Sequence, residues 1–221
     1  FLDKMNILKK ESYFVILLYH GGKEHYALPS PNQKKICEFF INQGVNIVVC
    51  QHSHIGGLIS TFQSKKIFYG QGNFLFDPYP IKKEWLYKGF LIDIELKNGK
   101  IMDIILHPIY HKSFNSSNQI GIDLMSGLIK KDYLDNLNQL IEKISLDPEL
   151  IEKSWKDLAL SNKNLIMSVL NGNGRIMRNI NKYIPFLNLK YTENDKLLIK
   201  NYINCETHLE LMRSLFNDAK D

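Results

Sequence analysis

Apolar positions in the first quarter of the chain form two strand-like runs separated by a helical pattern. Residues 13–19 (YFVILLY) are continuously apolar, with aromatic and β-branched side chains, which predicts a strand buried on both faces. Residues 30–44 open with a capping serine, a proline at the first helical position and a glutamine able to reach back to the cap, and they end in glycine. Residues 45–50 (VNIVVC) predict a second short strand. This order of strand, helix and strand predicts a βαβ unit with parallel strands.

A β-hairpin is predicted further along the chain. Apolar and polar residues alternate over 90–96, the dipeptide Asn98-Gly99 suits a two-residue type I′ turn, and residues 101–106 supply the returning strand. Residues 67–70 predict another short strand, and residues 1–10 have the spacing of a helix end.

Strand-like alternation disappears after about residue 112. Helical patterns are predicted over residues 147–170 and, after a break at 171–174, from Thr192 towards residue 216. The expected fold is therefore α/β (α+β), with one domain over residues 1–112 and an all-helical extension over residues 113–221.

The composition narrows the classes of protein to consider. The chain has 221 residues, of which 44% are hydrophobic and 23% charged, which excludes intrinsic disorder. Its net charge of +5 is spread over the whole length, so no nucleic-acid partner is predicted. No apolar stretch is long enough to predict a membrane-spanning segment. Cys37, Cys50 and Cys205 lack the spacing of a disulfide framework or a thiolate zinc site.

Histidines follow both strands of the predicted βαβ unit. His20 ends the first strand, and His52 and His54 come just after the second. Ligands of open α/β sheets bind outside the carboxyl ends of the strands, so three imidazoles are expected to face one volume. In extended backbone, His52 and His54 would project to the same side, as a metal-binding pair requires. Glu24 and His25 lie within reach of the same volume.

Each histidine taken alone has a simpler interpretation. A single histidine at a strand end is more often a hydrogen-bonded structural residue than a ligand, and an H-x-H pair is a weak motif. The argument for a metal site rests on their convergence at one βαβ unit. His25 remains open to both interpretations, and His107, His111 and His208 are expected on hairpin or helix surfaces.

Three segments together resemble a known family. The stretches YHGGKEHYALPSPNQ (19–33), VNIVVCQHSHIGG (45–57) and KKIFYGQGNFLFD (65–77) resemble, in order and spacing, the carboxyl-terminal half of the CapA family, the poly-gamma-glutamate capsule-synthesis proteins. The resemblance covers about residues 13–110. It implies the calcineurin-like metallophosphoesterase fold, an αββα sandwich of which this chain would hold the second half.

The resemblance also implies roles for individual residues. His20, His52 and His54 would be metal ligands, and Glu24 and Asn73 would act on the substrate or support the ligands. The expected cofactors are divalent metal ions of the Mn, Fe or Zn type, with two in the complete domain. Asp77 follows the G-N-F element at Gly72 to Phe74.

The sequence departs from the family pattern in three respects. Gly21 replaces the usual aromatic residue and is expected to open the pocket, and Gln51 replaces a histidine. No D-x-H, G-D or G-N-H element precedes His20, so we expect the N-terminal half of the domain to lie outside this sequence. This chain alone is then expected to be inactive, since a two-metal site needs more ligands.

Two functional hypotheses follow. The first is part of a capsule-synthesis protein with a metal-dependent phosphoesterase-type hydrolase site. The alternative is a non-catalytic relative that binds an anionic polymer or an assembly partner. The chain is expected to be soluble as given, in the bacterial cytoplasm or at the cell envelope if an N-terminal anchor precedes it.

Overall fold

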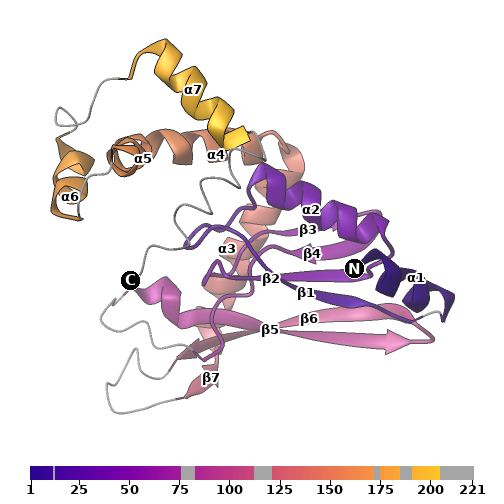
Figure 1. The fold of residues 1–221 in the computed structure, drawn as a ribbon. Coiled ribbons are helices and arrows are strands. Elements are labelled where there is room, and N and C mark those ends of the chain that lie inside the picture. The colour runs from indigo at the N-terminus through magenta and orange to yellow at the C-terminus, as the bar shows by residue number, and fades with distance from the viewer. Residues whose placement is uncertain (12, 76–82, 112–120, 172–174, 185–190, 205–221) are drawn as a thin grey trace. The chain divides into compact units, whose positions relative to one another are not determined.

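The structure is a computed structural model that describes residues 1–204, apart from residue 12 and residues 76–82, 112–120, 172–174 and 185–190 (Figure 1). Asp77, Cys205 and His208 therefore lie outside the described residues. The chain divides into two compact units, Phe1–Lys156 and Asp157–Asp221, and each is considered by itself.

The predicted βαβ unit is present in the first unit. Strands β1 (Ile16–His20) and β2 (Ile47–Gln51) pair in parallel, and helix α2 (Pro31–Asn42) connects them. Strands β3 (Ile59–Phe62) and β4 (Lys65–Phe68) complete a four-stranded sheet with the order β1-β2-β4-β3. The sequence predicted only the second of these two strands, β4.

Helix α2 begins as predicted, but its cap differs in one respect. The Ser30 hydroxyl accepts a hydrogen bond from the Gln33 backbone N–H at 3.1 Å, and Pro31 occupies the first helical position. The Gln33 side chain does not return to the cap. Its amide donates to the Gly21 carbonyl at 3.2 Å, so it fixes the turn that follows His20.

The predicted hairpin forms most of a second sheet. Strands β5 (Lys88–Lys97) and β6 (Lys100–His111) pair antiparallel after the short helix η1 (Glu84–Tyr87). Asn98 and Gly99 have φ angles of 51° and 71°, which confirms the type I′ turn. Strand β7 (Ile122–Leu124) adds to β6 and corrects the expectation that strands end before residue 113.

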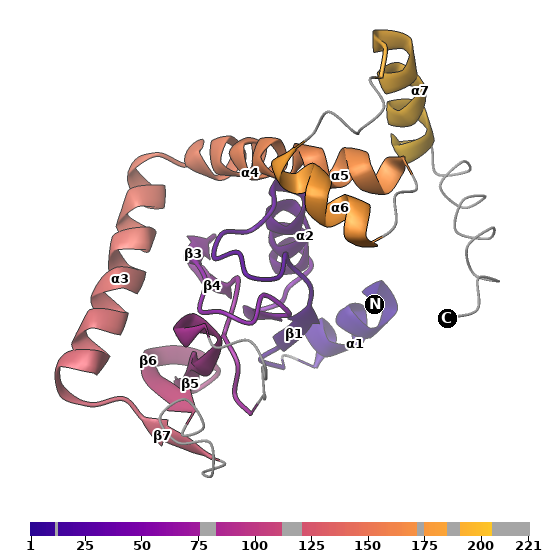
Figure 2. The same cartoon turned by 90° about the vertical axis from the view of Figure 1, so that its left-hand side faces the viewer.

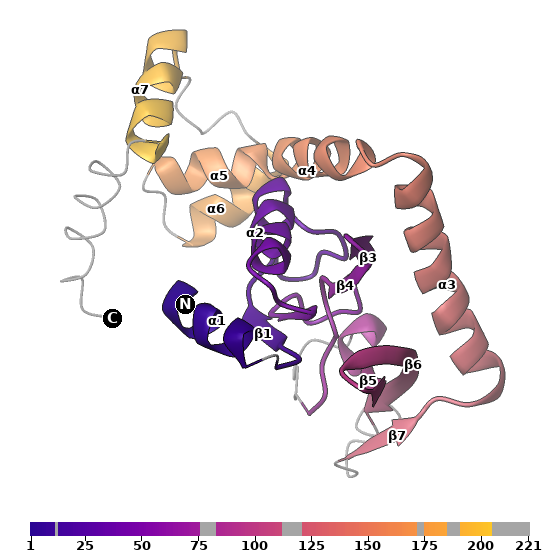
Figure 3. The same cartoon turned by 90° about the vertical axis from the view of Figure 1, so that its right-hand side faces the viewer.

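The first unit stacks a helical layer on two sheets. Figures 2 and 3 show α2 and the β5–β6 hairpin on opposite sides of the four-stranded sheet, with α3 (Gly127–Leu146) running alongside. One core cluster packs α2 and α1 (Leu2–Lys10) against the four-stranded sheet, and the other fills the space between the sheets. Helix α3 contributes Ile141 to both clusters, so it belongs to this unit.

Strand β1 is an edge strand, and the prediction that it is buried on both faces is wrong. It begins at Ile16 and not at Tyr13, and its residues alternate between exposed and half-buried. Ile16 is 42% exposed and Leu18 is 69% exposed. Their partners across the ladder, Ile47 and Val49, are buried between the two sheets.

The remaining elements are helical. The single stretch predicted over residues 147–170 is two helices, α4 (Leu150–Ser161) and α5 (Lys163–Leu170), which follow α3. Helices α6 (Arg175–Tyr183) and α7 (Glu193–Asn204) complete the described part, and α7 has the predicted Thr192 cap. The described helices include none that is long and apolar enough to cross a membrane.

Candidate metal centre

The structure brings the three predicted histidine rings together at the ends of β1 and β2. The parallel register sets His20 opposite Gln51, and the Gly21 N–H continues the ladder by donating to the Gln51 carbonyl at 3.0 Å. His20 Nε2 and His52 Nδ1 are 3.1 Å apart. The rings of His52 and His54 have centroids 6.0 Å apart.

The backbone at these histidines is not extended, contrary to the geometric argument from the H-x-H spacing. His52 and His54 have φ angles of 106° and 59°, and His25 has a φ of 60°. Non-glycine residues rarely adopt positive φ, and each such residue costs about 1–3 kcal/mol unless its surroundings enforce it. Two neighbouring loops thus hold three histidines in a conformation that non-glycine residues rarely adopt.

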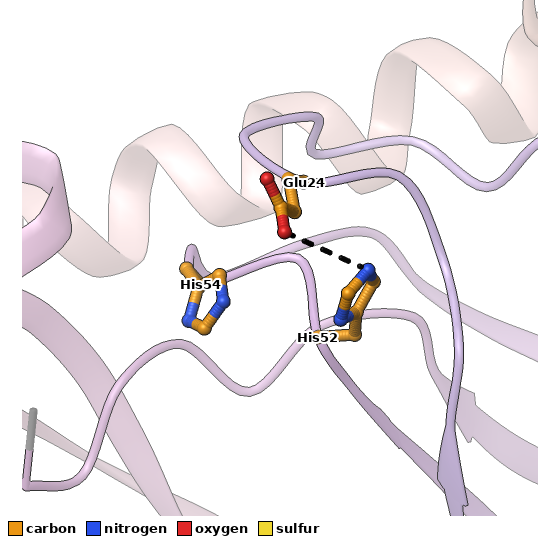
Figure 4. A group of neighbouring side chains, drawn as sticks. All are labelled: Glu24, His52 and His54. Atoms are coloured by element: carbon orange, nitrogen blue, oxygen red, sulfur yellow. Dashed lines mark ion pairs between the residues drawn. The ribbon is translucent and has the colours of Figure 1, made fainter. Parts of the chain in front are cut away.

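Glu24 joins His52 and His54 in a group of metal-ligand type (Figure 4). One ligand atom from each of the three lies within 4.8 Å of the others, and His52 Nε2 is 3.9 Å from Glu24 Oε1. Two imidazole nitrogens and a carboxylate oxygen suit Zn²⁺, Mn²⁺ or Fe²⁺. Bonds of about 2.0–2.2 Å require only a modest closing of these side chains, so the donor set fits an ion. His20 lies beside this group, in contact with His52, and is not one of its members.

Asn73 orients His54. The Asn73 amide nitrogen donates to the Leu86 carbonyl at 2.8 Å, which turns the amide oxygen towards His54 Nδ1, also at 2.8 Å. His54 Nδ1 therefore carries the proton, and Nε2 carries the lone pair that a metal ion needs. Asn73 is buried, so this arrangement is shielded from water.

Two glycines let the segment of Asn73 approach strand β5. A Cβ at Gly72, whose φ is 80°, would lie 2.6 Å from the Cα of Gly89. A Cβ at Gly89 would lie 2.6 Å from the Asn73 carbonyl oxygen. The G-N-F element is thus held against β5 at backbone contact distance.

The histidines predicted to lie on surfaces divide into two kinds. His107 is partly exposed and lies 3.6 Å from Asp93 in the neighbouring strand. His111 is buried, which corrects the expectation. Its Nε2 lies 3.4 Å from the Asn73 carbonyl oxygen, and its ring packs edge-on against Tyr87. The amino-acid pattern held no signal for this role, because the returning strand was predicted only over residues 101–106, whereas β6 continues to His111.

A cavity of about 280 Å³ opens beside the histidines. His20, His52, His54 and Asn73 line it, with apolar side chains from Phe74 to Ile109 on the other walls. A larger hollow of about 800 Å³ between α2 and α4 contains no histidine among its lining residues. The predicted histidine ligands therefore line the smaller cavity.

Gly21 does not open this cavity in the way expected. A Cβ at Gly21 would lie 2.6 Å from the ring of Tyr19, so the Tyr19 ring occupies the place of an aromatic side chain. Gln51 donates from its amide to the Gln71 side chain at 3.1 Å, which links the ends of β2 and β4.

His25 lies beside Trp85 and His54. Its backbone N–H donates to the Ser53 carbonyl at 2.8 Å, which joins the loop after β1 to the loop after β2. Its ring lies between those of Trp85 and His54, with centroid distances of 4.7 and 6.2 Å. Desolvation by burial lowers the pKa of the His25 imidazole, which favours its neutral form.

Comparisons with known proteins agree with this geometry. The sequence model of the family Bacterial capsule synthesis protein PGA_cap matches residues 3–78, which include all the predicted ligands. The PGA biosynthesis protein CapA of Bacillus subtilis (strain 168) is 30% identical over 77 residues, which are 35% of this chain and 20% of that protein. The Capsule biosynthesis protein CapA of Bacillus anthracis is 32% identical over 69 residues, 31% of this chain and 17% of that protein.

The matched segment contains the whole four-stranded sheet and α2. His20 ends β1 in this segment, Glu24 lies in the loop after β1, and His52 and His54 lie in the loop after β2. The matched segment spans a fifth or less of the length of these two relatives. Over residues 3–78, the chain is therefore similar to the CapA proteins of bacterial capsule synthesis.

Proposed function

We propose that this chain carries part of a metal-dependent, phosphoesterase-type hydrolase site that serves capsule or poly-gamma-glutamate synthesis. The observation that carries the proposal is the convergence of Glu24, His52 and His54 within 4.8 Å, on two loops that hold both histidines at positive φ. Bound divalent ions of the Mn, Fe or Zn type would polarise a phosphoryl-type oxygen and lower the pKa of a bound water.

The residues of this chain would divide the work between binding and positioning. His52 Nε2, His54 Nε2 and Glu24 Oε1 supply donors. Asn73 accepts from His54 Nδ1–H, which leaves His54 Nε2 free to bind an ion. His52 Nδ1 lies 3.1 Å from His20 Nε2, which would accept from it when His52 binds an ion through Nε2. In this arrangement His20 is a positioning residue, and it becomes a ligand only when its ring turns from His52.

The proposed partner of this site is the other half of a metallophosphoesterase-like domain, which would supply the remaining ligands. A two-metal site holds its ions about 3.5–4 Å apart and needs more donors than the four side chains assembled here. Support for further β-structure comes from β1, whose outer edge is unpaired among the described residues and whose Leu18 is largely exposed. The expected substrate is an anionic polymer or another phosphoester-type compound.

The test begins with metal binding to this chain. Titration calorimetry with Mn²⁺ and Zn²⁺ should show one site per chain, and His54→Ala should weaken it at least tenfold. His107→Ala is the matched control, because His107 is a partly exposed histidine outside the group. Equal binding by wild type and His54→Ala would overturn the site.

Activity is tested in a protein that includes the preceding half of the domain. Hydrolysis of a chromogenic phosphodiester should require added metal and should be lost in His52→Ala and His54→Ala. Equal turnover in these variants would refute the hydrolase. A folded, metal-free protein that retains an anionic polymer would instead favour the non-catalytic binding function. The observation that supports this alternative is that the group of metal-ligand type has only three members, Glu24, His52 and His54.

A further inference from the structure

Two cysteines meet in the core of the first unit. Cys37 on α2 and Cys50 on β2 are both fully buried, and their sulfur atoms are 3.6 Å apart. They lie 13 positions apart in the chain, and both are free thiols. Their spacing in the sequence did not predict this contact, because it forms between a helix and a strand that lies between two others in its sheet.

The surroundings of the two thiols are apolar. Both cysteines belong to a core cluster that contains Ile41, Val48 and Ile67. A buried cysteine often does no more than fill space as a small apolar residue. Here the two sulfur atoms face one another, so each thiol has the other as a hydrogen-bond partner. The side chains therefore meet through the one atom of each that can form a further covalent bond.

A bond between the two sulfur atoms requires only small movements. The S–S bond length is about 2.05 Å, so the atoms have to approach one another by about 1.5 Å. If both side chains share this approach, each sulfur moves by about 0.8 Å, which a rotation of about 30° around its Cα–Cβ bond provides. The backbone can stay in place, since Cys50 is paired with Tyr19 in the ladder and α2 is held by the Ser30 cap.

We propose that Cys37 and Cys50 form an intramolecular disulfide when the chain folds in the presence of a small disulfide oxidant such as oxidised glutathione. One cysteine thiolate attacks a sulfur of the oxidant, which forms a mixed disulfide and releases one glutathione. The second cysteine thiolate attacks the protein sulfur of the mixed disulfide and releases the other glutathione. Two protein thiols are oxidised to one disulfide, one oxidant disulfide is reduced to two thiols, and the two protons pass to the released thiols.

The reaction belongs to the folding chain and not to the folded one. Both sulfur atoms are fully buried after folding, so an oxidant of the size of glutathione does not reach them. The hydrogen bond with Cys50 and burial also raise the pKa of the Cys37 thiol, which keeps it protonated. The same burial shields the disulfide from reductants. The product ties α2 to β2, the strand that leads to His52.

This inference does not depend on the proposed hydrolase. Neither cysteine belongs to the group of Glu24, His52 and His54. The disulfide is detected without a metal ion or a substrate, so its failure and the failure of the metal site are separate results.

The experiment uses the full chain with Cys205→Ser, so that only the two core thiols remain. The reduced chain is unfolded in urea and refolded in a mixture of reduced and oxidised glutathione. We expect one product, lighter by two hydrogen atoms and free of bound glutathione. Glu38 lies between the two cysteines, whereas no Lys or Arg does. Cleavage after glutamate should therefore release two peptides joined by the disulfide, and trypsin should leave both cysteines in one peptide.

Unfolding in urea, with and without reductant, measures the effect of the bond on stability. The ratio of folded to unfolded chain should be about 100-fold higher in the oxidised form, because the bond closes a loop of about 14 residues in the unfolded chain. Cys37→Ala in the same background is the matched control. It keeps Cys50 but cannot form the bond, so reductant should leave its stability unchanged. The mass analysis of the parent chain holds whether or not this variant folds.

Shielding by the core is tested by the rate of reduction. Dithiothreitol should reduce the oxidised chain at least 100-fold more slowly under native conditions than in urea, because the folded core blocks access to both sulfur atoms. Mass analysis of samples taken over time measures both rates.

Three results would overturn the proposal. The first is a refolded chain whose cysteines stay free or carry glutathione instead of joining one another. The second is an oxidised chain that is less stable than the reduced one, because the bond would then not fit the folded core. The third is equally fast reduction of the folded and the unfolded chain, which would show that the sulfur atoms are not enclosed.

Discussion

At the scale of single residues, the candidate site depends on the hydrogen bond that fixes which nitrogen of His54 carries a proton. Two successive hydrogen bonds connect buried backbone to this imidazole. The Asn73 amide nitrogen donates to the Leu86 carbonyl, and the Asn73 amide oxygen accepts from His54. The His111 ring contacts Asn73 from the other side, since its Nε2 lies 3.4 Å from the backbone carbonyl oxygen of Asn73. Residues that touch no ion can therefore control the affinity for one.

Replacement of Asn73 by Ala should weaken binding of Mn²⁺ or Zn²⁺ by about 10- to 100-fold, because His54 loses the acceptor that fixes its tautomer. It should also destabilise the fold by about 1–3 kcal/mol, since the Leu86 carbonyl loses its donor in a buried setting. Calorimetric titration and urea unfolding measure the two effects separately.

Asn46→Ala provides the control for this variant. The Asn46 side chain accepts from the Val15 backbone N–H at 2.8 Å, far along the sheet from the histidines. Its loss should lower stability and leave metal affinity unchanged. Equal loss of affinity in both variants would show that Asn73 acts only through general stability.

The sequence predicted the positions of His20, His52, His54 and Asn73 because strand ends and family motifs can be located without coordinates. It did not predict His111, whose role arises from packing between a distant strand and the G-N-F segment. It also assigned the Gln33 side chain to the helix cap. In the structure that side chain reaches the Gly21 carbonyl, a tertiary contact that competes with the local one.

At the scale of elements, α2 holds the loop that follows His20 in place. Its cap fixes where the helix begins, and Gln33 in its first turn holds the chain just after His20. Predicted and observed boundaries agree where local chemistry decides them, as at Ser30-Pro31 and Asn98-Gly99. Strand β3 was missed because its four residues after two glycines show no clear alternation, and only pairing with β4 makes them a strand.

Removal of the cap in Ser30→Ala should cost about 1 kcal/mol of stability, because the Gln33 N–H loses its acceptor. Urea unfolding followed by circular dichroism measures this loss. Ser126 precedes α3 in the same position but makes no side-chain cap bond, so Ser126→Ala should change stability little. A similar loss in both variants would contradict the assignment of the cap.

At the scale of the whole molecule, the two sheets do not form a closed sandwich, because one side of β1 is exposed. Ile16 and Leu18 continue the apolar surface of Ile47 and Val49, but the second sheet does not cover them. The sequence could not reveal this, because an apolar run predicts a strand and says nothing of whether a neighbour is present.

A comparison of two lengths of the protein tests this feature. In a protein extended upstream of Phe1, Leu18→Ser should cost about 1.5–3 kcal/mol, because the side chain becomes buried. In the present chain the same variant should have little effect, and unfolding in urea measures both. Leu124→Ser on β7 is the control and should behave alike in both lengths. Equal effects of Leu18→Ser in the two proteins would show that nothing covers β1.

The left-handed backbone at His25, His52 and His54 has a consequence for protein engineering. Transplanting these imidazoles and Glu24 onto an unrelated loop of ordinary conformation would reproduce the ligand types but not their directions. A designer would have to copy both loops together with the strands and glycines that force their shape. The backbone conformation of the two loops, as much as the ligand side chains, therefore determines where the imidazole nitrogens lie.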